Sequence, residues 1–101
     1  MTAAPAVTVA ICTFRRNEVM AELVRRIGEI AASEIPDGSV RVLVVDDSPE
    51  GGAATTVEVL RNDLTIQVDY DASASANISI ARNRALTLGV TDSNFIACLD
   101  D

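Results

Sequence analysis

The sequence predicts an α/β fold in which a Rossmann-like parallel sheet carries helices on both faces. Short apolar runs typical of buried strands alternate with longer stretches whose apolar residues recur every three or four positions, as on one side of a helix. This alternation covers all 101 residues without a linker or a low-complexity tract, so residues 1–101 are expected to form one small folded unit. Strands separated by helices favour parallel pairing through right-handed crossovers.

The first half of the chain is expected to hold two strands and two helices. Val7–Thr13 is a nearly continuous run of small apolar residues, typical of a buried strand, and Asn17 is placed to cap the helix that follows. The apolar residues of this helix recur at helical spacing: Val19, Met20, Leu23, Val24, Ile27, Ile30 and Ala31. A segment with a proline and a glycine ends it, and the apolar run Val40–Val45 predicts a second strand. After a loop, a short helix is expected over Ala53–Leu60.

The second half continues the alternation with a different kind of strand. In Leu64–Tyr70 apolar and polar residues strictly alternate, which is typical of a strand with one face in water, as at the edge of a sheet. A polar loop follows, then a helix from about Ile80 to Leu88 that Gly89 ends, and a last strand over Asn94–Leu99. In a doubly wound sheet of this kind, a ligand binds at the carboxyl ends of the strands.

The composition argues against nucleic acid as a partner. The chain has a net charge of −7 and no histidine, and its eight basic residues are scattered, whereas binding a phosphate backbone requires clustered Lys and Arg. Its first residues contain neither a positively charged leader nor a membrane-spanning apolar run, which favours a cytosolic protein. Cys12 and Cys98 lie in apolar runs without metal-ligand spacing, so buried reduced thiols are expected.

Two adjacent acids follow the second strand. Asp46 and Asp47 are placed to accept hydrogen bonds from a ribose hydroxyl or a base N–H, and the Ser-Pro-Gly loop after them permits close approach of a backbone. The alternative is that one of them caps the following turn. Because the chain has neither a GxGxxG motif after its first strand nor a Walker loop, ordinary dinucleotide or P-loop binding is unsupported.

Basic residues gather at the start of the third helix. Arg82 and Arg84 lie near its first backbone N–H groups, where a phosphate could be held, and Asn83 between them is a poor helix former. The alternative is that both arginines lie on a solvated helix face.

The last strand leads into a second pair of acids, Asp100 and Asp101. Two carboxylates at the end of a buried strand repel each other unless an ion lies between them, and Mg²⁺ or Mn²⁺ prefers such oxygen ligands. Since alternate residues of a strand point the same way, the natural partner of Asp100 is the position just after Asp101.

Together these segments resemble the nucleotide-binding half of a GT-A glycosyltransferase, in particular of the large inverting family 2. The resemblance rests on an opening strand "TVAICTFRR", on "VRVLVVDDS", on an "ARN.A" helix, and on "FIACLDD" as the lead-in to the DxD motif of that family. It implies the strand order 3-2-1-4, with the alternating strand at an edge. It also implies that residues 1–101 are an incomplete domain, a fragment that stops inside the DxD motif.

The resemblance also implies a set of site residues. The nucleotide-binding residues would be Thr13, Arg15, Asp46, Asp47, Asn77 and Arg82, and the metal ligands for Mg²⁺ or Mn²⁺ would be Asp100 and Asp101. In this family the metal stabilises the departing diphosphate of a nucleotide-diphospho-sugar while a carboxylate base deprotonates the acceptor. The chain departs from the family pattern at Cys12–Arg15, where Pro-Thr-Tyr-Asn is common, and in "DDSPEGG", where the family has Asp-Asp-Gly-Ser-Thr-Asp.

By this resemblance the whole protein would transfer a sugar from a UDP-sugar to a glycan or lipid-linked acceptor, in polysaccharide or cell-surface glycan synthesis. It would do so in the cytoplasm or at the inner face of the membrane. Because the base and the acceptor site belong to the second half of the family fold, the chain alone is expected to be inactive. It is also expected to self-associate through the exposed strand 94–99.

Two other classes compete with this interpretation. The segment "VLVVDDSPEGG" also resembles the start of a response-regulator receiver, in which paired acids bind Mg²⁺. In a receiver, however, the acid pair ends the first strand, and this chain has no lysine to complete such a site. The other alternative is a Rossmann-like interaction module without a ligand.

Overall fold

A computed structural model of the chain describes residues 7–34, 39–72, 80, 83–85, 87 and 95–100. Its elements are β1 (Val7–Thr13), α1 (Asn17–Glu34), β2 (Val40–Asp46), α2 (Ala54–Asp63), β3 (Gln67–Ala72) and β4 (Phe95–Asp100). The four strands lie in the order β3-β2-β1-β4, and each neighbouring pair is parallel. The predicted α/β fold with a parallel sheet is therefore confirmed.

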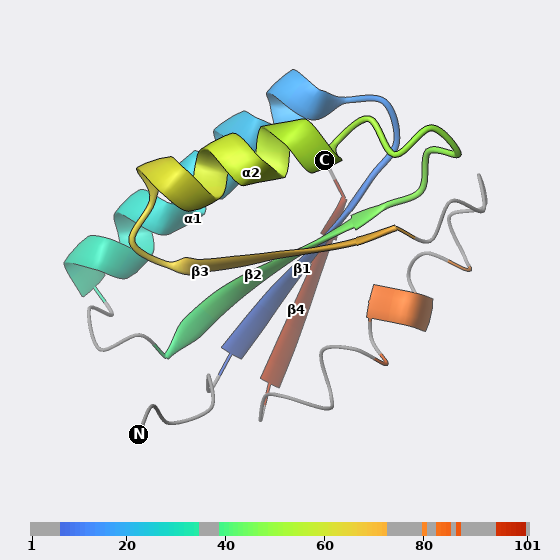
Figure 1. Ribbon diagram of the computed structural model, residues 1–101. Coiled ribbons are helices and arrows are strands. Elements are labelled where there is room, and N and C mark those ends of the chain that lie inside the picture. Colours follow the sequence, from blue (N-terminus) through green and yellow to red (C-terminus); the bar gives the residue numbers. More distant parts are fainter. Residues whose placement is uncertain are drawn as a thin grey trace.

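One face of the sheet is covered by α1 and α2, which lie side by side across the strands (Figure 1). Alternate residues of β1, β2 and β3 point to this face, and they meet the apolar sides of the two helices. The buried residues of this main core are Ile11, Met20, Val24, Val42, Val44, Ala53, Val57, Leu60 and Val68. The helical periodicity of α1 therefore marks the side that the helix buries, except at Val19 and Ile30, which are exposed.

The other face of the sheet has a smaller core. It consists of Ala10, Cys12, Leu43, Val45 and Ala85. Ala85 comes from the short helical segment that lies on this face in Figure 1, and the described residues of that segment, Ile80, Asn83–Ala85 and Thr87, are helical. Helical residues thus flank the sheet on both faces, as predicted. Cys12 is the buried, reduced thiol that was expected, whereas the side chain of Cys98 lies outside the described residues.

The predicted strand Leu64–Tyr70 is wrong at its start. The helix α2 runs to Asp63, beyond the predicted end at Leu60, and the N–H of Leu64 donates to the Leu60 carbonyl. Leu64 therefore closes the helix, and its side chain packs towards α1, where a Cβ placed on Gly28 would lie 3.3 Å from a Leu64 methyl carbon. The strand begins only at Gln67, and it lies at one edge of the sheet.

The start of α1 also differs in detail from the expectation. The helix begins at Asn17, but the carbonyl that accepts the first helical hydrogen bond, from the N–H of Met20, belongs to Arg16. Arg16 thus occupies the capping position. The Asn17 side chain donates to the carbonyl of Gly52 at 3.0 Å, so it ties α1 to the loop after β2.

The other sheet edge is β4, which was expected one residue earlier, at Asn94–Leu99, and is observed at Phe95–Asp100. Ala97 is exposed, and Leu99 keeps 39% of its surface in solvent. An apolar groove of about 220 Å³ lies between α1 and the sheet, lined by Val7, Val9, Ile27, Ile30, Ala31 and Val40 from β1, α1 and β2. Within the described parts of the chain, neither helix is long and apolar enough to cross a membrane.

Candidate functional site at the carboxyl edge of the sheet

The parallel sheet brings three of the predicted site positions to one edge. Thr13 at the end of β1 is the register partner of Asp46 at the end of β2. Asp100 at the end of β4 is the register partner of Cys12, one residue before Thr13. The N–H of Asp47 extends this pairing by donating to the Thr13 carbonyl at 2.9 Å. The chain therefore places these positions where doubly wound sheets bind ligands.

Asp46 is a buried carboxylate whose two oxygens each accept two hydrogen bonds. Oδ1 accepts the backbone N–H of Ser48 at 3.0 Å and its hydroxyl at 2.6 Å. Oδ2 accepts the N–H of Ala53 at 3.0 Å and the hydroxyl of Tyr70 at 2.9 Å. The side chain is only 1% exposed, so its hydrogen bonding is met from within the protein.

These hydrogen bonds determine how Asp46 ionises. Burial raises the pKa of Asp46, but the four hydrogen bonds from Ser48, Ala53 and Tyr70 together outweigh burial and hold the pKa below its usual value. Asp46 is therefore an anion at neutral pH. This geometry corresponds to the turn-capping alternative considered for the acid pair, because Asp46 bonds the backbone two residues ahead.

The loop after β2 is folded around the Asp46 carboxylate. Ser48 also accepts from the loop that follows it: its carbonyl accepts the N–H of Gly51 at 3.1 Å and its hydroxyl accepts the N–H of Gly52 at 3.3 Å. Gly51 has a φ of +64°, a conformation that favours glycine. A Cβ at Gly51 would lie 3.4 Å from the Tyr70 hydroxyl oxygen. The glycine thus lets the loop turn tightly beside Tyr70.

Tyr70 is a member of this site that the sequence interpretation did not include. Burial, together with the hydrogen bond to the Asp46 carboxylate, raises the pKa of Tyr70 to about 12. Its position was visible only as an apolar member of the alternating edge strand. A residue that far along the chain from Asp46, with a separation of 24 positions, gives no local signal of the contact.

Thr13 lies opposite Asp46 and differs from it completely in hydrogen bonding. The residue is 2% exposed, and within the described ranges its hydroxyl oxygen has no hydrogen-bond partner. An unpaired buried hydroxyl is unfavourable in a folded protein, and such groups call for a functional or structural explanation. Asp47, which follows Asp46, is likewise buried, at 3% exposure.

Arg15 connects the loops after β1 and β2 at the protein surface. Its Nε donates to Glu50 at 2.7 Å and a terminal nitrogen donates to the other Glu50 oxygen at 3.3 Å. This hydrogen-bonded pair raises the pKa of Arg15 and lowers the pKa of Glu50. Arg15 has a φ of 55° and its guanidinium carbon lies 4.9 Å from the ring centre of Phe14. The predicted nucleotide-binding arginine is thus held by a partner that the sequence did not indicate.

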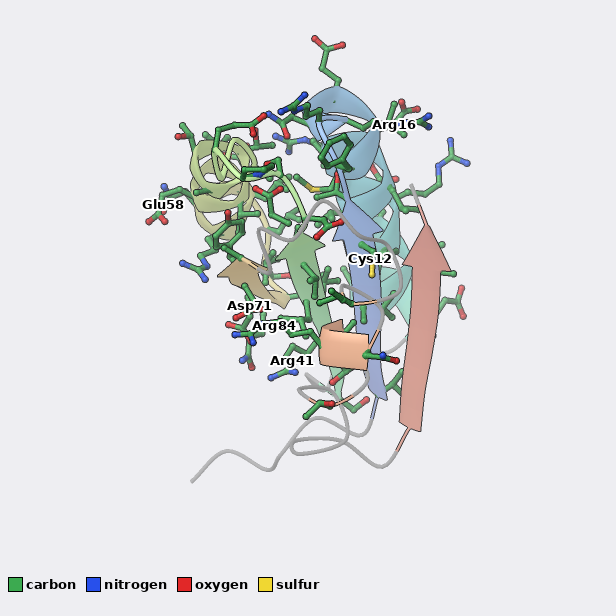
Figure 2. All side chains as sticks on the ribbon, turned by 90° about the vertical axis from the view of Figure 1, so that its right-hand side faces the viewer. Cys12, Arg16, Arg41, Glu58, Asp71 and Arg84 are labelled. Atoms are coloured by element: carbon green, nitrogen blue, oxygen red, sulfur yellow. The ribbon has the colours of Figure 1, made fainter. Side chains whose placement is uncertain are left out.

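On the second face of the sheet, Arg84 forms an ion pair with Asp71. Figure 2 looks onto this face, where the two labelled side chains point toward one another. One terminal nitrogen of Arg84 lies 3.0 Å from Asp71 Oδ1, and its Nε donates to Oδ2. This hydrogen bond and the negative charge of Asp71 raise the pKa of Arg84. Arg84, although exposed, therefore anchors its helical segment to β3, and its role towards a phosphate stays a prediction.

Several predicted site residues lie outside the described part of the chain. These are Asn77, Arg82, Asp101 and the side chain of Asp100. Among the residues that the structure does describe, no group of three or more acidic, cysteine or histidine side chains could hold a metal ion. The roles predicted for these residues remain predictions.

Comparison with known proteins found one informative relative. The chain is 38% identical over 96 residues to the succinoglycan biosynthesis protein ExoM of Rhizobium meliloti (strain 1021). The matched region covers 94% of this chain and 29% of that protein, so the chain spans less than a third of its relative. No family model matches the chain, and no solved structure gives a significant match.

Proposed function

We propose that this chain is the nucleotide-binding part of a GT-A glycosyltransferase of family 2 that takes part in polysaccharide synthesis. The observation that carries the proposal is the similarity, over nearly the whole chain, to a protein named for succinoglycan biosynthesis. Polysaccharides are assembled by the transfer of sugar units, and a parallel α/β sheet with polar groups at its carboxyl edge is a suitable frame for a nucleotide. Sugar transfer is assigned to the whole protein, in the cytoplasm or at the inner membrane face.

In this proposal the donor is a nucleotide-diphospho-sugar, with a UDP-sugar as the first candidate, and the acceptor is a glycan or a lipid-linked sugar. The Thr13 hydroxyl, which is buried and unpaired within the described residues, offers a donor and an acceptor to the nucleotide. Asp46 and Asp47 are assigned to the base or ribose, and the resemblance to family 2 adds Arg15, Asn77 and Arg82 as further nucleotide-binding residues.

A divalent cation, Mg²⁺ or Mn²⁺, belongs to the same proposal. Asp100 ends the strand beside β1, and carboxylate oxygens are the ligands that these ions prefer. Asp100 and Asp101 would hold the ion, which when bound supplies charge stabilisation to a departing diphosphate. The catalytic base and the acceptor site are assigned to the rest of the whole protein, so we expect the 101-residue chain alone to transfer no sugar.

Calorimetric titration of the chain tests this proposal against its alternatives. The chain would be titrated with UDP in the presence of Mg²⁺, with Mg²⁺ alone, and with Mg²⁺ plus a phosphoryl analogue such as beryllofluoride. The proposal expects binding of UDP with Mg²⁺. Binding of Mg²⁺ and the phosphoryl analogue without UDP would instead indicate a receiver, and binding of neither would indicate an interaction module.

The proposal also includes self-association of the chain through β4. The edge strand β4 carries the exposed residues Ala97 and Leu99. An edge of this kind presents backbone groups that can pair with a second copy of the same strand. Sedimentation at increasing concentration is expected to show a dimer that Leu99→Glu weakens. A monodisperse monomer at high concentration would contradict this part.

A further inference from the structure

The carboxyl end of β3 is in contact with both segments that flank the proposed pocket. Tyr70 and Asp71 are neighbours on this strand, and their side chains point to opposite faces of the sheet. Tyr70 donates to Asp46, which organises the loop after β2. Asp71 accepts from Arg84, which lies two positions after the predicted nucleotide-binding residue Arg82.

From these contacts we infer that Tyr70 and Asp71 are positioning residues of the nucleotide pocket, one for each flanking segment. The inference rests on the proposed function, because it assumes that the pocket binds a nucleotide. Neither residue is assigned a direct contact with the nucleotide. Each acts through a charged partner, Asp46 or Arg84.

Tyr70 supplies one of the hydrogen bonds that stabilise the buried carboxylate of Asp46. Oδ2 of Asp46 accepts a hydrogen bond from the Ala53 N–H and another from the Tyr70 hydroxyl. Removing the Tyr70 hydroxyl leaves the buried Asp46 carboxylate with one hydrogen-bond donor fewer. Oδ2, which loses this bond, also accepts the Ala53 N–H at the start of α2, so that contact becomes less well fixed.

On the other face of the sheet, a two-point ion pair between Asp71 and Arg84 holds the helical segment that contains Arg84. A guanidinium that bonds both oxygens of one carboxylate fixes the orientation as well as the distance of its segment. The buried side chain of Ala85, the next residue, packs under the segment in the smaller core. The pair therefore holds the start of this segment against β3.

The test compares three substitutions on one strand. Tyr70→Phe removes only the hydroxyl, and Asp71→Asn removes the charge that holds Arg84. Asp69→Asn is the matched control. Asp69 lies on the same strand and pairs with Arg41, at 3.4 Å, and with Gln67, but it contacts neither flanking segment through these bonds. The Asp69→Asn variant therefore shows how much a general loss of stability alone changes UDP affinity.

Calorimetric titration with UDP and Mg²⁺ is the first measurement. We expect Tyr70→Phe to weaken UDP binding about tenfold and Asp71→Asn to weaken it severalfold, while Asp69→Asn stays within about twofold of the unsubstituted chain. Equal affinity in all four proteins would overturn the inference and leave the proposed function standing. Absence of UDP binding by the unsubstituted chain would instead remove the proposed function.

Site-resolved amide hydrogen exchange is the second measurement, and it needs no nucleotide. Tyr70→Phe is expected to speed exchange at the Ser48 and Ala53 amides, which bond Asp46, while amides within β1 and β2 keep their protection. Asp71→Asn is expected to speed exchange at Ala85 with the same selectivity. Uniform acceleration, or none at these amides, would overturn the inference whether or not UDP binds.

Discussion

Asp46 and Thr13 are register partners at the ends of neighbouring strands, but their side chains differ in hydrogen bonding. Asp46, at the end of β2, accepts four hydrogen bonds from Ser48, Ala53 and Tyr70. Thr13, its register partner at the end of β1, is equally buried, yet no described residue bonds its hydroxyl. The carboxylate holds the loop after β2, whereas in the proposed function the hydroxyl is the group that meets the nucleotide.

Under the proposed function, this difference assigns Asp46 to the shaping of the site and Thr13 to contact with the ligand. A strand-end acid in a nucleotide-binding sheet is readily assigned to the ligand, and the sequence favoured that role for Asp46 as well. The structure shows that this acid accepts hydrogen bonds from four donors of its own protein, which belong to Ser48, Ala53 and Tyr70. Substituting each residue and measuring stability and nucleotide binding separately therefore tests whether Asp46 and Thr13 have different roles.

The largest effect is expected for Asp46→Ala. The substitution leaves the buried N–H groups of Ser48 and Ala53 and the hydroxyl of Tyr70 without their acceptor. We expect a loss of about 3–5 kcal/mol in the free energy of unfolding, measured by urea denaturation. Asp63→Asn, which removes only a surface ion pair with Arg25, is the control and should change stability little. A small effect of Asp46→Ala would mean that the loop does not depend on this carboxylate.

A smaller and opposite change in stability is expected for Thr13→Val. The valine keeps the shape of the side chain and removes a hydroxyl that has no partner among the described residues. The free energy of unfolding should therefore stay the same or rise by up to about 1 kcal/mol. At the same time, UDP affinity measured by calorimetry should fall about tenfold. A loss of stability without a loss of affinity would reverse the roles assigned to Thr13 and Asp46.

The smallest effect is expected for the ionisation of Tyr70, and it is measured by titration in alkaline solution. Because the folded pKa of Tyr70, about 12, is raised above the ordinary value of 10.0, the protonated phenol stabilises the fold. This contribution is fully present below pH 10.0 and is lost as the pH rises toward 12. Tyr70 is the only tyrosine, so tyrosinate absorbance reports on it alone. A midpoint at the ordinary value in the folded chain would contradict both the burial of Tyr70 and its hydrogen bond to Asp46.

Much of the sheet could be predicted from local patterns, because each strand and helix has its own apolar periodicity. The start of β1 and the start of β2 lie where the sequence places them, at Val7 and Val40. The start of β3 could not be predicted in this way. Leu64 and Ile66 continue the alternation of the strand, but they are used to cover α1 after a helix that runs further than expected.

Of the candidate site, only the positions that parallel strand pairing brings to one edge could be predicted from the sequence. Parallel strands bring Thr13 and Asp46 to one edge whatever their side chains do. The contacts that give these residues different roles come from residues distant in sequence, such as Tyr70 for Asp46 and Glu50 for Arg15. Such contacts depend on how the loops close over the sheet, and composition or spacing does not reveal them.

The most direct test of the proposed nucleotide site is an amide chemical-shift titration of the chain with UDP and Mg²⁺. We expect the amides of Thr13, Asp47 and the Ser48–Gly52 loop to shift together and to saturate, while the amides around Arg41 and Asp69, further along the sheet, stay in place. No saturating shift at the carboxyl edge, or shifts confined to other surfaces, would contradict the assignment of this edge as the nucleotide site.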